Sequence, residues 1–128
     1  MKKLEAYKQA KADFKFAAEV VNNLGETIKE IGIVEVSNSI TVTRSSSDKQ
    51  MIYAVGILNA QLQACKELGV DSTELESNKA KIIELRKLSN DYDSWKDYRD
   101  DIYSYAQDIY KLLDKDDLFA LLEAPVKP

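Results

Sequence analysis

The sequence predicts a mainly α-helical fold: a helical bundle of four to five helices with one short β-hairpin inserted between the first two helices. Apolar residues recur every three to four positions over most of the chain, which places them on one face of a helix. Between residues 33 and 43 this spacing changes to strict alternation, as in a half-buried strand. Serine and aspartate precede the apolar pattern of residues 48–68 and glycine follows it, as at the two ends of a helix.

The length and composition are those of one soluble globular domain, with 128 residues, 45% of them hydrophobic and 31% charged. We therefore expect a single helical domain over residues 1–123 and a flexible tail over 124–128. The sequence shows neither a run of about 18 apolar residues that could span a membrane nor an apolar signal segment behind its first lysines. A single cysteine, Cys65, can form no internal disulfide, so the expected location is the cytoplasm, that of the host cell if the protein is viral.

The first helix is expected from Lys2 to about Glu30. Gly25 lies inside its apolar pattern and weakens the helix by about 1 kcal/mol relative to alanine, so a bend or an early end there stays open. The polar side contains three lysines at helical spacing, Lys8, Lys11 and Lys15. Such a row is most often a solvated face, but lysines in a row also neutralise phosphates, and with Arg44 these three are the candidate nucleic-acid surface.

The alternating stretch predicts a β-hairpin over about residues 33–43. Asn38 lies in the connection, where it can adopt the left-handed conformation of a tight loop. The apolar face consists of Val34, Val36, Ile40 and Val42. Two strands alone are marginally stable, so this face is expected either to pack on helices or to pair with another subunit. These four residues are therefore the candidate oligomer interface.

The helix that follows the hairpin is expected to start at about Asp48, behind a run of capping serines, and to end at Gly69. Its expected apolar seam is Ile52, Val55, Leu58, Leu62, Cys65 and Leu68. A third helix is capped by residues 71–73, and a fourth starts near Asn90 and runs to about Leu113. One long helix over the same stretch is also allowed, although a break or kink near Asn90 is favoured. A final short helix is expected from Asp114.

Few residues of this sequence are of the types that usually carry out catalysis or bind a metal ion. The chain has no histidine, which removes the commonest general base and His-ligated zinc, and its four glycines form no phosphate-binding loop. Asp93, Asp97 and Asp101 lie four residues apart and allow a carboxylate-only magnesium or calcium site, but a solvated helix face is far commoner. We expect no enzyme, no cofactor, no metal site and no small-molecule ligand.

Charge and aromatic residues are unevenly placed along the chain. Residues 1–15 contain five lysines and two acidic residues, whereas residues 91–117 contain nine aspartates and four basic residues. Tyrosines alternate with these aspartates, and tyrosine is frequent at protein interfaces. The candidate partner-binding residues are Asp97, Tyr98, Asp100, Asp101, Tyr103 and Tyr105, of which the three tyrosines are expected to be partly exposed. The alternative is that the tyrosines are partly buried core residues.

The order of elements over residues 7–77 resembles the phage terminase small subunits, which take part in packaging viral DNA. A helix with an aromatic residue and alanines ends in Glu30-Ile31-Gly32-Ile33, a β-like excursion follows, and a second helix closes on Glu67-Leu68-Gly69-Val70. The asparagine-proline that often opens the second helix of the family is replaced by Asp48-Lys49. The resemblance implies a non-enzymatic homo-oligomeric adaptor that binds viral DNA and the large terminase subunit.

Two further hypotheses belong to different classes. The chain could be a small acidic phage or mobile-element protein that binds and inhibits a host factor through its Asp/Tyr-rich helix. It could also be a structural helical module without a ligand. The packaging adaptor predicts a defined oligomer, and the host-factor inhibitor predicts tight binding to a basic protein. The structural module predicts neither.

Overall fold

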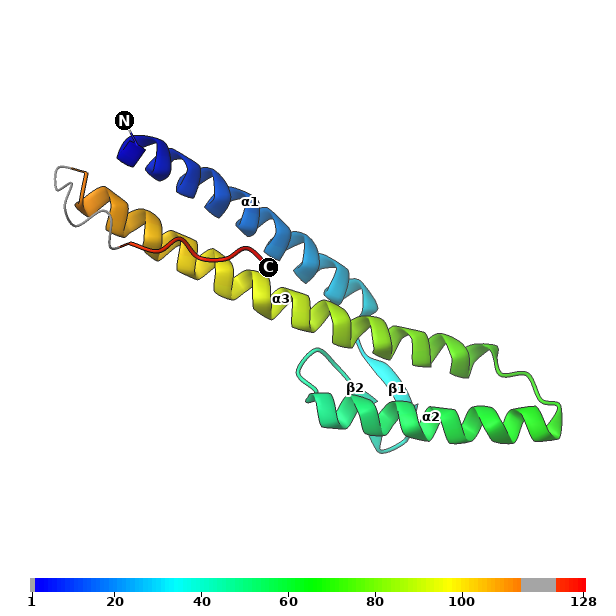
Figure 1. Ribbon diagram of the computed structural model, residues 1–128. Helices are drawn as coiled ribbons and strands as arrows, with labels where there is room; N and C mark the ends of the chain where they lie inside the picture. The colour runs from blue at the N-terminus through cyan, green and yellow to red at the C-terminus, as the bar shows by residue number, and fades with distance from the viewer. Residues whose placement is uncertain (1, 114–121) are drawn as a thin grey trace. The chain divides into compact units, whose positions relative to one another are not determined.

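A computed structural model describes residues 2–113 and 122–128 of the chain. Its elements, in order, are α1 (Lys2–Ile31), β1 (Val34–Ser37), β2 (Ile40–Val42), α2 (Asp48–Leu68) and α3 (Thr73–Lys111) (Figure 1). The chain divides into two compact units. Unit 1 consists of Met1–Gly25 and Asp91–Pro128, and unit 2 consists of Glu26–Asn90. Helices α1 and α3 each contribute residues to both units.

The prediction of four to five helices is wrong, because the described part of the chain contains three. Residues 73–111 form one continuous helix without the break favoured near Asn90. Leu88 is buried just before this position and Tyr92 is half-buried just after it, so packing holds the helix on both sides. Packing of this kind outweighs the weak local preference of Ser, Asn and Asp for helix ends. The short helix expected from Asp114 falls largely outside the described residues.

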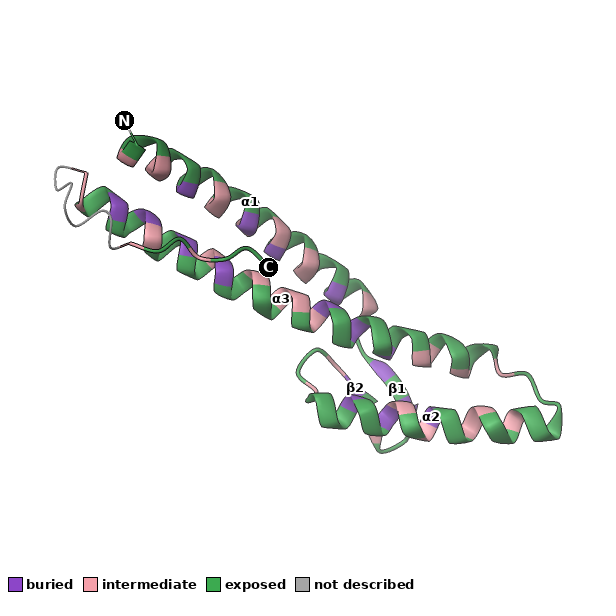
Figure 2. Ribbon diagram, in the orientation of Figure 1, coloured by how far each residue is buried: buried purple, intermediate pink, exposed green. Residues whose placement is uncertain are grey.

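The predicted hairpin between the first two helices is confirmed. Strands β1 and β2 of unit 2 pair antiparallel, with Val34 opposite Val42 and Glu35 opposite Thr41, and the register becomes irregular before Ser37. Val34, Val36 and Val42 are buried and Ile40 is half-buried, whereas Glu35 and Thr41 between them are exposed (Figure 2). The alternation of the sequence therefore gives the strands one apolar and one polar face. Helix α2 contacts both strands.

Local capping residues fix both ends of α2. The hydroxyl of Ser47 accepts a hydrogen bond from the Gln50 amide, and the Gln50 side chain accepts one from the Ser47 amide, a reciprocal pair known as a capping box. At the other end Gly69 has φ of 66°, a conformation that glycine adopts at little cost, and its amide donates to the Cys65 carbonyl. The predicted start at Asp48 and end at Gly69 are both confirmed.

The core of unit 2 is aliphatic. Leu58 of α2 and Ile82 and Leu85 of α3 are fully buried, with at most 1% of each residue exposed. The buried residues of α2 are Met51, Ala54 and Leu58, so the expected seam is confirmed at Leu58 but wrong at its two ends, Ile52 and Leu68. Ile52 itself is 55% exposed. The prediction placed the branched side chains of the helix in the core, whereas the structure buries Met51 and Ala54 there.

Unit 1 is an antiparallel pair formed by the first part of α1 and the last part of α3. The ring centroids of Tyr7 and Tyr110 lie 5.7 Å apart, and those of Phe14 and Tyr103 lie 5.6 Å apart. A Cβ atom at Gly25 would lie 3.6 Å from Tyr92. As the residue number rises along α1 it falls by the same amount along α3, which fixes the register of the pair. Gly25 neither bends α1 out of helical conformation nor ends it, because the helix continues to Ile31.

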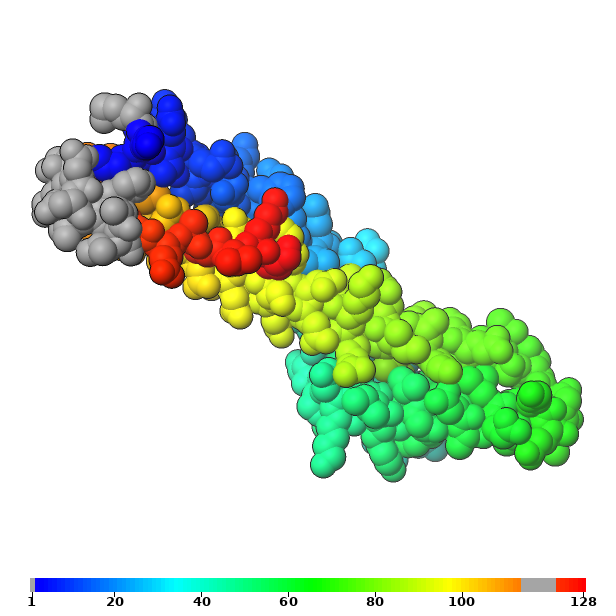
Figure 3. All heavy atoms as spheres, viewed as in Figure 1, coloured from blue at the N-terminus to red at the C-terminus, as the bar shows by residue number. Residues whose placement is uncertain are grey.

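The core of unit 1 matches small side chains on α1 with large ones on α3. Ala10 and Ala17 belong to the same buried cluster as Tyr98, Ile102 and Ile109. Alanines let the two backbones approach, and the rings of the partner helix fill the remaining space. Residues 122–128 run along this unit (Figure 3). In this segment Lys127 places its ammonium 4.3 Å from the centre of the Phe16 ring.

Candidate interaction surfaces

Within residues 2–113 and 122–128 the structure contains no group of three or more histidine, cysteine, aspartate or glutamate side chains placed to hold a metal ion. None of the helices in this described part is long and apolar enough to cross a membrane. The features from which a function can be argued are therefore surfaces: two charged helix faces in unit 1 and one apolar groove in unit 2.

The lysine ridge comprises Lys8, Lys11 and Lys15 on the outer face of α1. All three are exposed, whereas Ala10 and Ala17 of the same helix point into the core. The ammonium of Lys11 also lies 5.5 Å from the centre of the Tyr7 ring. Arg44, the fourth residue of the candidate nucleic-acid surface, is exposed in the turn after β2 and belongs to the other unit. The three lysines thus form one face of unit 1.

The aspartate ridge comprises Asp97, Asp101 and Asp108 on the outer face of α3. All three are exposed, and Asp101 and Asp108 line a shallow pocket with Leu122, Glu123 and Pro125 of the C-terminal segment. The neighbouring Asp100 is also exposed, but its carboxylate pairs with Arg99 at 3.1 Å. The sequence therefore located the acidic residues correctly on an exposed helix face.

The tyrosines of the candidate partner-binding set are not equivalent. Tyr103 is 52% exposed and Tyr105 is half-buried, but Tyr98 is only 5% exposed, contrary to expectation. Tyr98 packs edge-on against Trp95 in the core of unit 1. Burial, together with the negative charge of Asp13, raises the pKa of its hydroxyl. Tyr98 therefore helps to hold α1 against α3 and is not free to contact a partner.

The two ridges lie at the same height along unit 1. Tyr7 is level with Tyr110, so Lys8 is level with Ile109 and one residue away from the level of Asp108. Phe14 is level with Tyr103, so Lys15 is level with Ile102 and one residue away from the level of Asp101. At 1.5 Å per residue, each ridge spans about 10 Å between these positions. Unit 1 thus has a cationic face on α1 and an anionic face on α3 in nearly matching register, although Lys11 also lines a small pocket with Tyr103 and Gln107 of α3.

The four hairpin residues proposed for an oligomer interface lie in the interior of unit 2. Val34, Val36 and Val42 are each at most 8% exposed, and Ile40 is half-buried. The sequence left two alternatives for this face, and the chain itself supplies the helix that covers it. An interface between subunits cannot use these side chains unless unit 2 opens.

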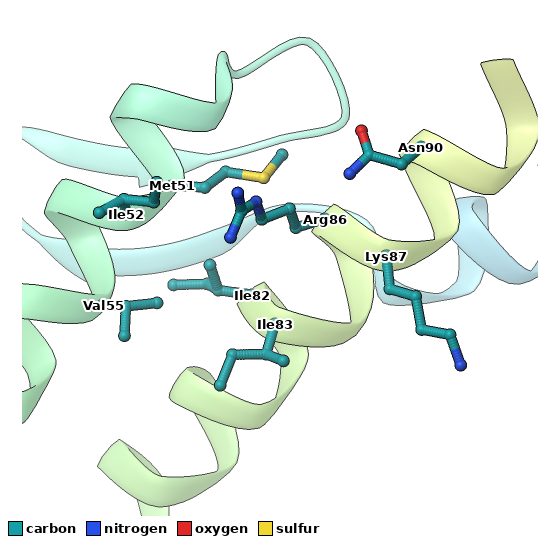
Figure 4. A pocket seen from close by; sticks show the side chains of 8 residues that line it. All are labelled: Met51, Ile52, Val55, Ile82, Ile83, Arg86, Lys87 and Asn90. Carbon is teal, nitrogen blue, oxygen red and sulfur yellow. The ribbon is translucent and has the colours of Figure 1, made fainter. Parts of the chain in front are cut away.

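An apolar groove of about 430 Å³ lies between α2 and α3 in unit 2 (Figure 4). Met51 and Ile82 form its floor, while Ile52 and Ile83 stand at its sides and are 55% and 52% exposed. Sequence reasoning missed this groove because it assigned Ile52 to the core. The signal was present: Ile82-Ile83 are adjacent, and two neighbouring residues of one helix cannot both point inward.

Comparisons with models of protein families, with curated proteins and with solved structures find no match to this chain. The resemblance to terminase small subunits thus gains no support from them. A functional argument has to start from the ridges and the groove themselves.

Proposed function

We propose that this chain is a non-catalytic, self-assembling adaptor for DNA packaging, in which the lysine ridge of one copy contacts the aspartate ridge of the next. The observation that supports the proposal is the matched register of the two ridges in unit 1. When a second copy lies beside the first without sliding along the helix axes, Lys8 faces Asp108 and Lys15 faces Asp101. Opposite charges at matched heights favour this alignment and disfavour shifted ones.

The strength of such a contact follows from its exposure. A solvent-exposed lysine–carboxylate pair contributes about 0.2–1 kcal/mol, so the two matched pairs together contribute about 0.4–2 kcal/mol. That is enough to orient the copies and to speed their encounter, but it gives weak pairwise affinity. The assembly is therefore expected to weaken strongly with salt, because the screening length falls from about 10 Å at 0.1 M to about 3 Å at 1 M.

The contact joins two different faces. Each copy in the assembly therefore uses its lysine ridge to contact one neighbour and its aspartate ridge to contact the other. A heterologous contact of this kind closes into a ring when the rotation between copies permits, and otherwise continues as a filament. A ring with viral DNA and the large terminase subunit as partners is what the family resemblance implies. In this proposal the adaptor role rests on the assembly and not on a catalytic residue.

The same lysines could instead bind DNA phosphates, because the attraction between an ammonium and an anionic oxygen does not depend on the source of the anion. The register of the aspartate ridge favours the assembly, since it places Asp108 and Asp101 within one residue of the heights of Lys8 and Lys15. The alternative of a host-factor inhibitor is weakened by the burial of Tyr98, which removes one of its expected contacts.

Charge reversal with complementation tests the proposal. One variant combines Lys8→Glu, Lys11→Glu and Lys15→Glu, and the other combines Asp97→Lys, Asp101→Lys and Asp108→Lys. In sedimentation velocity at low salt we expect the unmodified chain to assemble and each variant alone to be monomeric. Mixing the two variants should restore assembly with the variants alternating, because the introduced glutamates then meet the introduced lysines and the native lysines meet the native aspartates. A chain with all six changes should also assemble by itself.

A matched control carries three exposed unit 2 lysines changed in the same way, Lys49→Glu, Lys66→Glu and Lys81→Glu, and has the same net charge as the lysine-ridge variant. It should assemble like the unmodified chain. If the lysine-ridge variant still assembles but loses salt-dependent binding to a DNA duplex, the ridge is a nucleic-acid surface and the proposed contact between copies is refuted.

A further inference from the structure

The groove between α2 and α3 in unit 2 is apolar at its floor and open to solvent at its sides. Met51 and Ile82 are 2% and 1% exposed and belong to the core, whereas Ile52 and Ile83 are more than half exposed. Side chains of this size are usually turned inward, and two of them beside one hollow form a continuous apolar surface. This surface plays no part in the contact between ridges, which lies in unit 1.

The charges at one end of the groove are basic. Arg86 reaches towards α2 and pairs with Asp48, its Nε lying 3.1 Å from the carboxylate, so its charge is partly neutralised (Figure 4). Lys87 stands at the rim with its ammonium turned away from the apolar side chains. No acidic side chain lines the groove. A ligand that fits the groove therefore combines an apolar face with negative charge at one end.

The dimensions suit a helix. On α3 the lining runs from Ile82 to Asn90, about 12 Å at 1.5 Å per residue, which equals roughly two turns of a docked helix. Two turns present two or three apolar side chains at i, i+3 or i+4, and i+7, the pattern by which amphipathic helices bind grooves. The volume of about 430 Å³ lies within the roughly 300–1,000 Å³ range of protein binding pockets.

From these features we infer that the groove binds an acidic amphipathic helix of a partner protein, with its apolar face on Ile52 and Ile83 and its carboxylates near Lys87. The existence of a partner rests on the proposed adaptor function, and the inference adds the class of segment that the partner presents. A second copy of the chain placed groove to groove would also cover the isoleucines, but it contributes no acidic residue from the lining to meet Lys87.

The test uses the full chain and a fluorescently labelled helical peptide of 14 residues as a probe. The probe has leucines at i, i+4 and i+7 and glutamates at one end; one control peptide has the same composition in scrambled order, and another has lysines in place of the glutamates. In fluorescence anisotropy the acidic amphipathic probe should bind, the scrambled peptide should not, and the lysine peptide should bind about fivefold more weakly.

Chain variants identify the site. Ile83→Ser and Ile52→Ser should each weaken probe binding about tenfold, since each removes part of an apolar contact. Leu68→Ser, a change at a 77% exposed leucine outside the groove, should leave binding unchanged and serves as the matched control. Lys87→Glu should reverse the preference, so that the lysine peptide binds better than the acidic one.

Three outcomes would overturn the inference: equal binding of the scrambled peptide, equal effects of Ile83→Ser and Leu68→Ser, or loss of self-association in Ile83→Ser. The last would show that a second copy occupies the groove. Because the ridges belong to unit 1, a chain that binds the probe but does not assemble contradicts the proposed function alone. A chain that assembles but does not bind the probe contradicts only the inference about the groove.

Discussion

The two units reach stability by different means. Unit 1 packs alanines of α1 against aromatic and branched residues of α3, with Ala17 and Ile109 both fully buried. Unit 2 packs aliphatic side chains of two helices and a hairpin around Leu58 and Leu85. Close approach of two backbones dominates in the first unit, and burial of large aliphatic groups dominates in the second.

The outer surfaces of the two units also differ. Unit 1 turns charged residues outward on both helices, whereas unit 2 leaves Ile52 and Ile83 exposed beside a groove. Contacts made by the first surface should weaken as salt rises, and contacts made by the second should depend far less on salt. The comparison therefore predicts two interactions that can be separated by ionic strength.

The largest expected effect comes from the aliphatic core. Leu58→Ala should lower the free energy of unfolding by about 3 kcal/mol, because it removes buried methyl groups and leaves a cavity. Urea denaturation followed by circular dichroism measures this loss. Leu68→Ala, at a 77% exposed position of the same helix, is the control and should change stability by less than about 0.5 kcal/mol. Similar losses for both would show that Leu58 is not a core residue.

The close approach in unit 1 is tested by enlarging a small side chain. Ala17→Leu should destabilise the chain by about 1–3 kcal/mol, since the buried cluster has no room for the added atoms. Ala12→Leu, on the exposed face of the same helix, should have little effect. The same denaturation experiment applies, and a stabilised Ala17→Leu variant would show that the α1–α3 contact is loosely packed.

Removal of the α2 cap should have a smaller effect. Ser47→Ala eliminates the hydroxyl that accepts the Gln50 amide and should cost about 1 kcal/mol. Ser45→Ala is a suitable control in the same loop, because the Ser45 amide, and not its side chain, forms the hydrogen bond to Thr43. An unchanged midpoint of thermal unfolding in Ser47→Ala would mean that the cap does not stabilise α2.

The smallest expected effect concerns the start of α3. The hydroxyl and amide of Thr73 both donate to the Asp71 carboxylate, and these hydrogen bonds lower the pKa of Asp71. A lowered pKa in the folded state means that the stabilisation is present above the ordinary pKa of 3.8 and is lost as the pH falls through the folded value. Thr73→Val removes the hydroxyl donor and should raise the Asp71 pKa, as measured by carboxyl carbon NMR. No change would rule out this hydrogen bond.

Local signals in the sequence predicted local structure well. The alternation at Val34–Val42, the capping serine Ser47 and the glycine Gly69 each have short-range physical causes, and all three features are present. Two features depend on long-range packing and were predicted wrongly. Asn90 lies inside a continuous helix, and α2 buries Met51 instead of Ile52. Division into two units depends on such packing as well.

The candidate surfaces show the same limit. Lysines and aspartates at helical spacing predicted two exposed faces, but their matched heights depend on the register of α1 against α3. That register is set by ring contacts between residues 89 and 103 positions apart, for which no short sequence pattern exists. The groove likewise required both α2 and α3 to be in place.

Site-specific disulfide formation between copies tests the proposed contact most directly. In a Cys65→Ala background, Lys8→Cys and Asp108→Cys place two thiols on opposite outer faces of unit 1, too far apart to join within one chain. A disulfide needs Cα atoms about 4.4–6.8 Å apart, so it can form only where neighbouring copies bring the ridges together in register. We predict a ladder of linked copies on a non-reducing gel at low salt, and none for the shifted pair Lys8→Cys with Asp93→Cys. Monomer alone for the matched pair, or equal ladders for both pairs, would contradict the account.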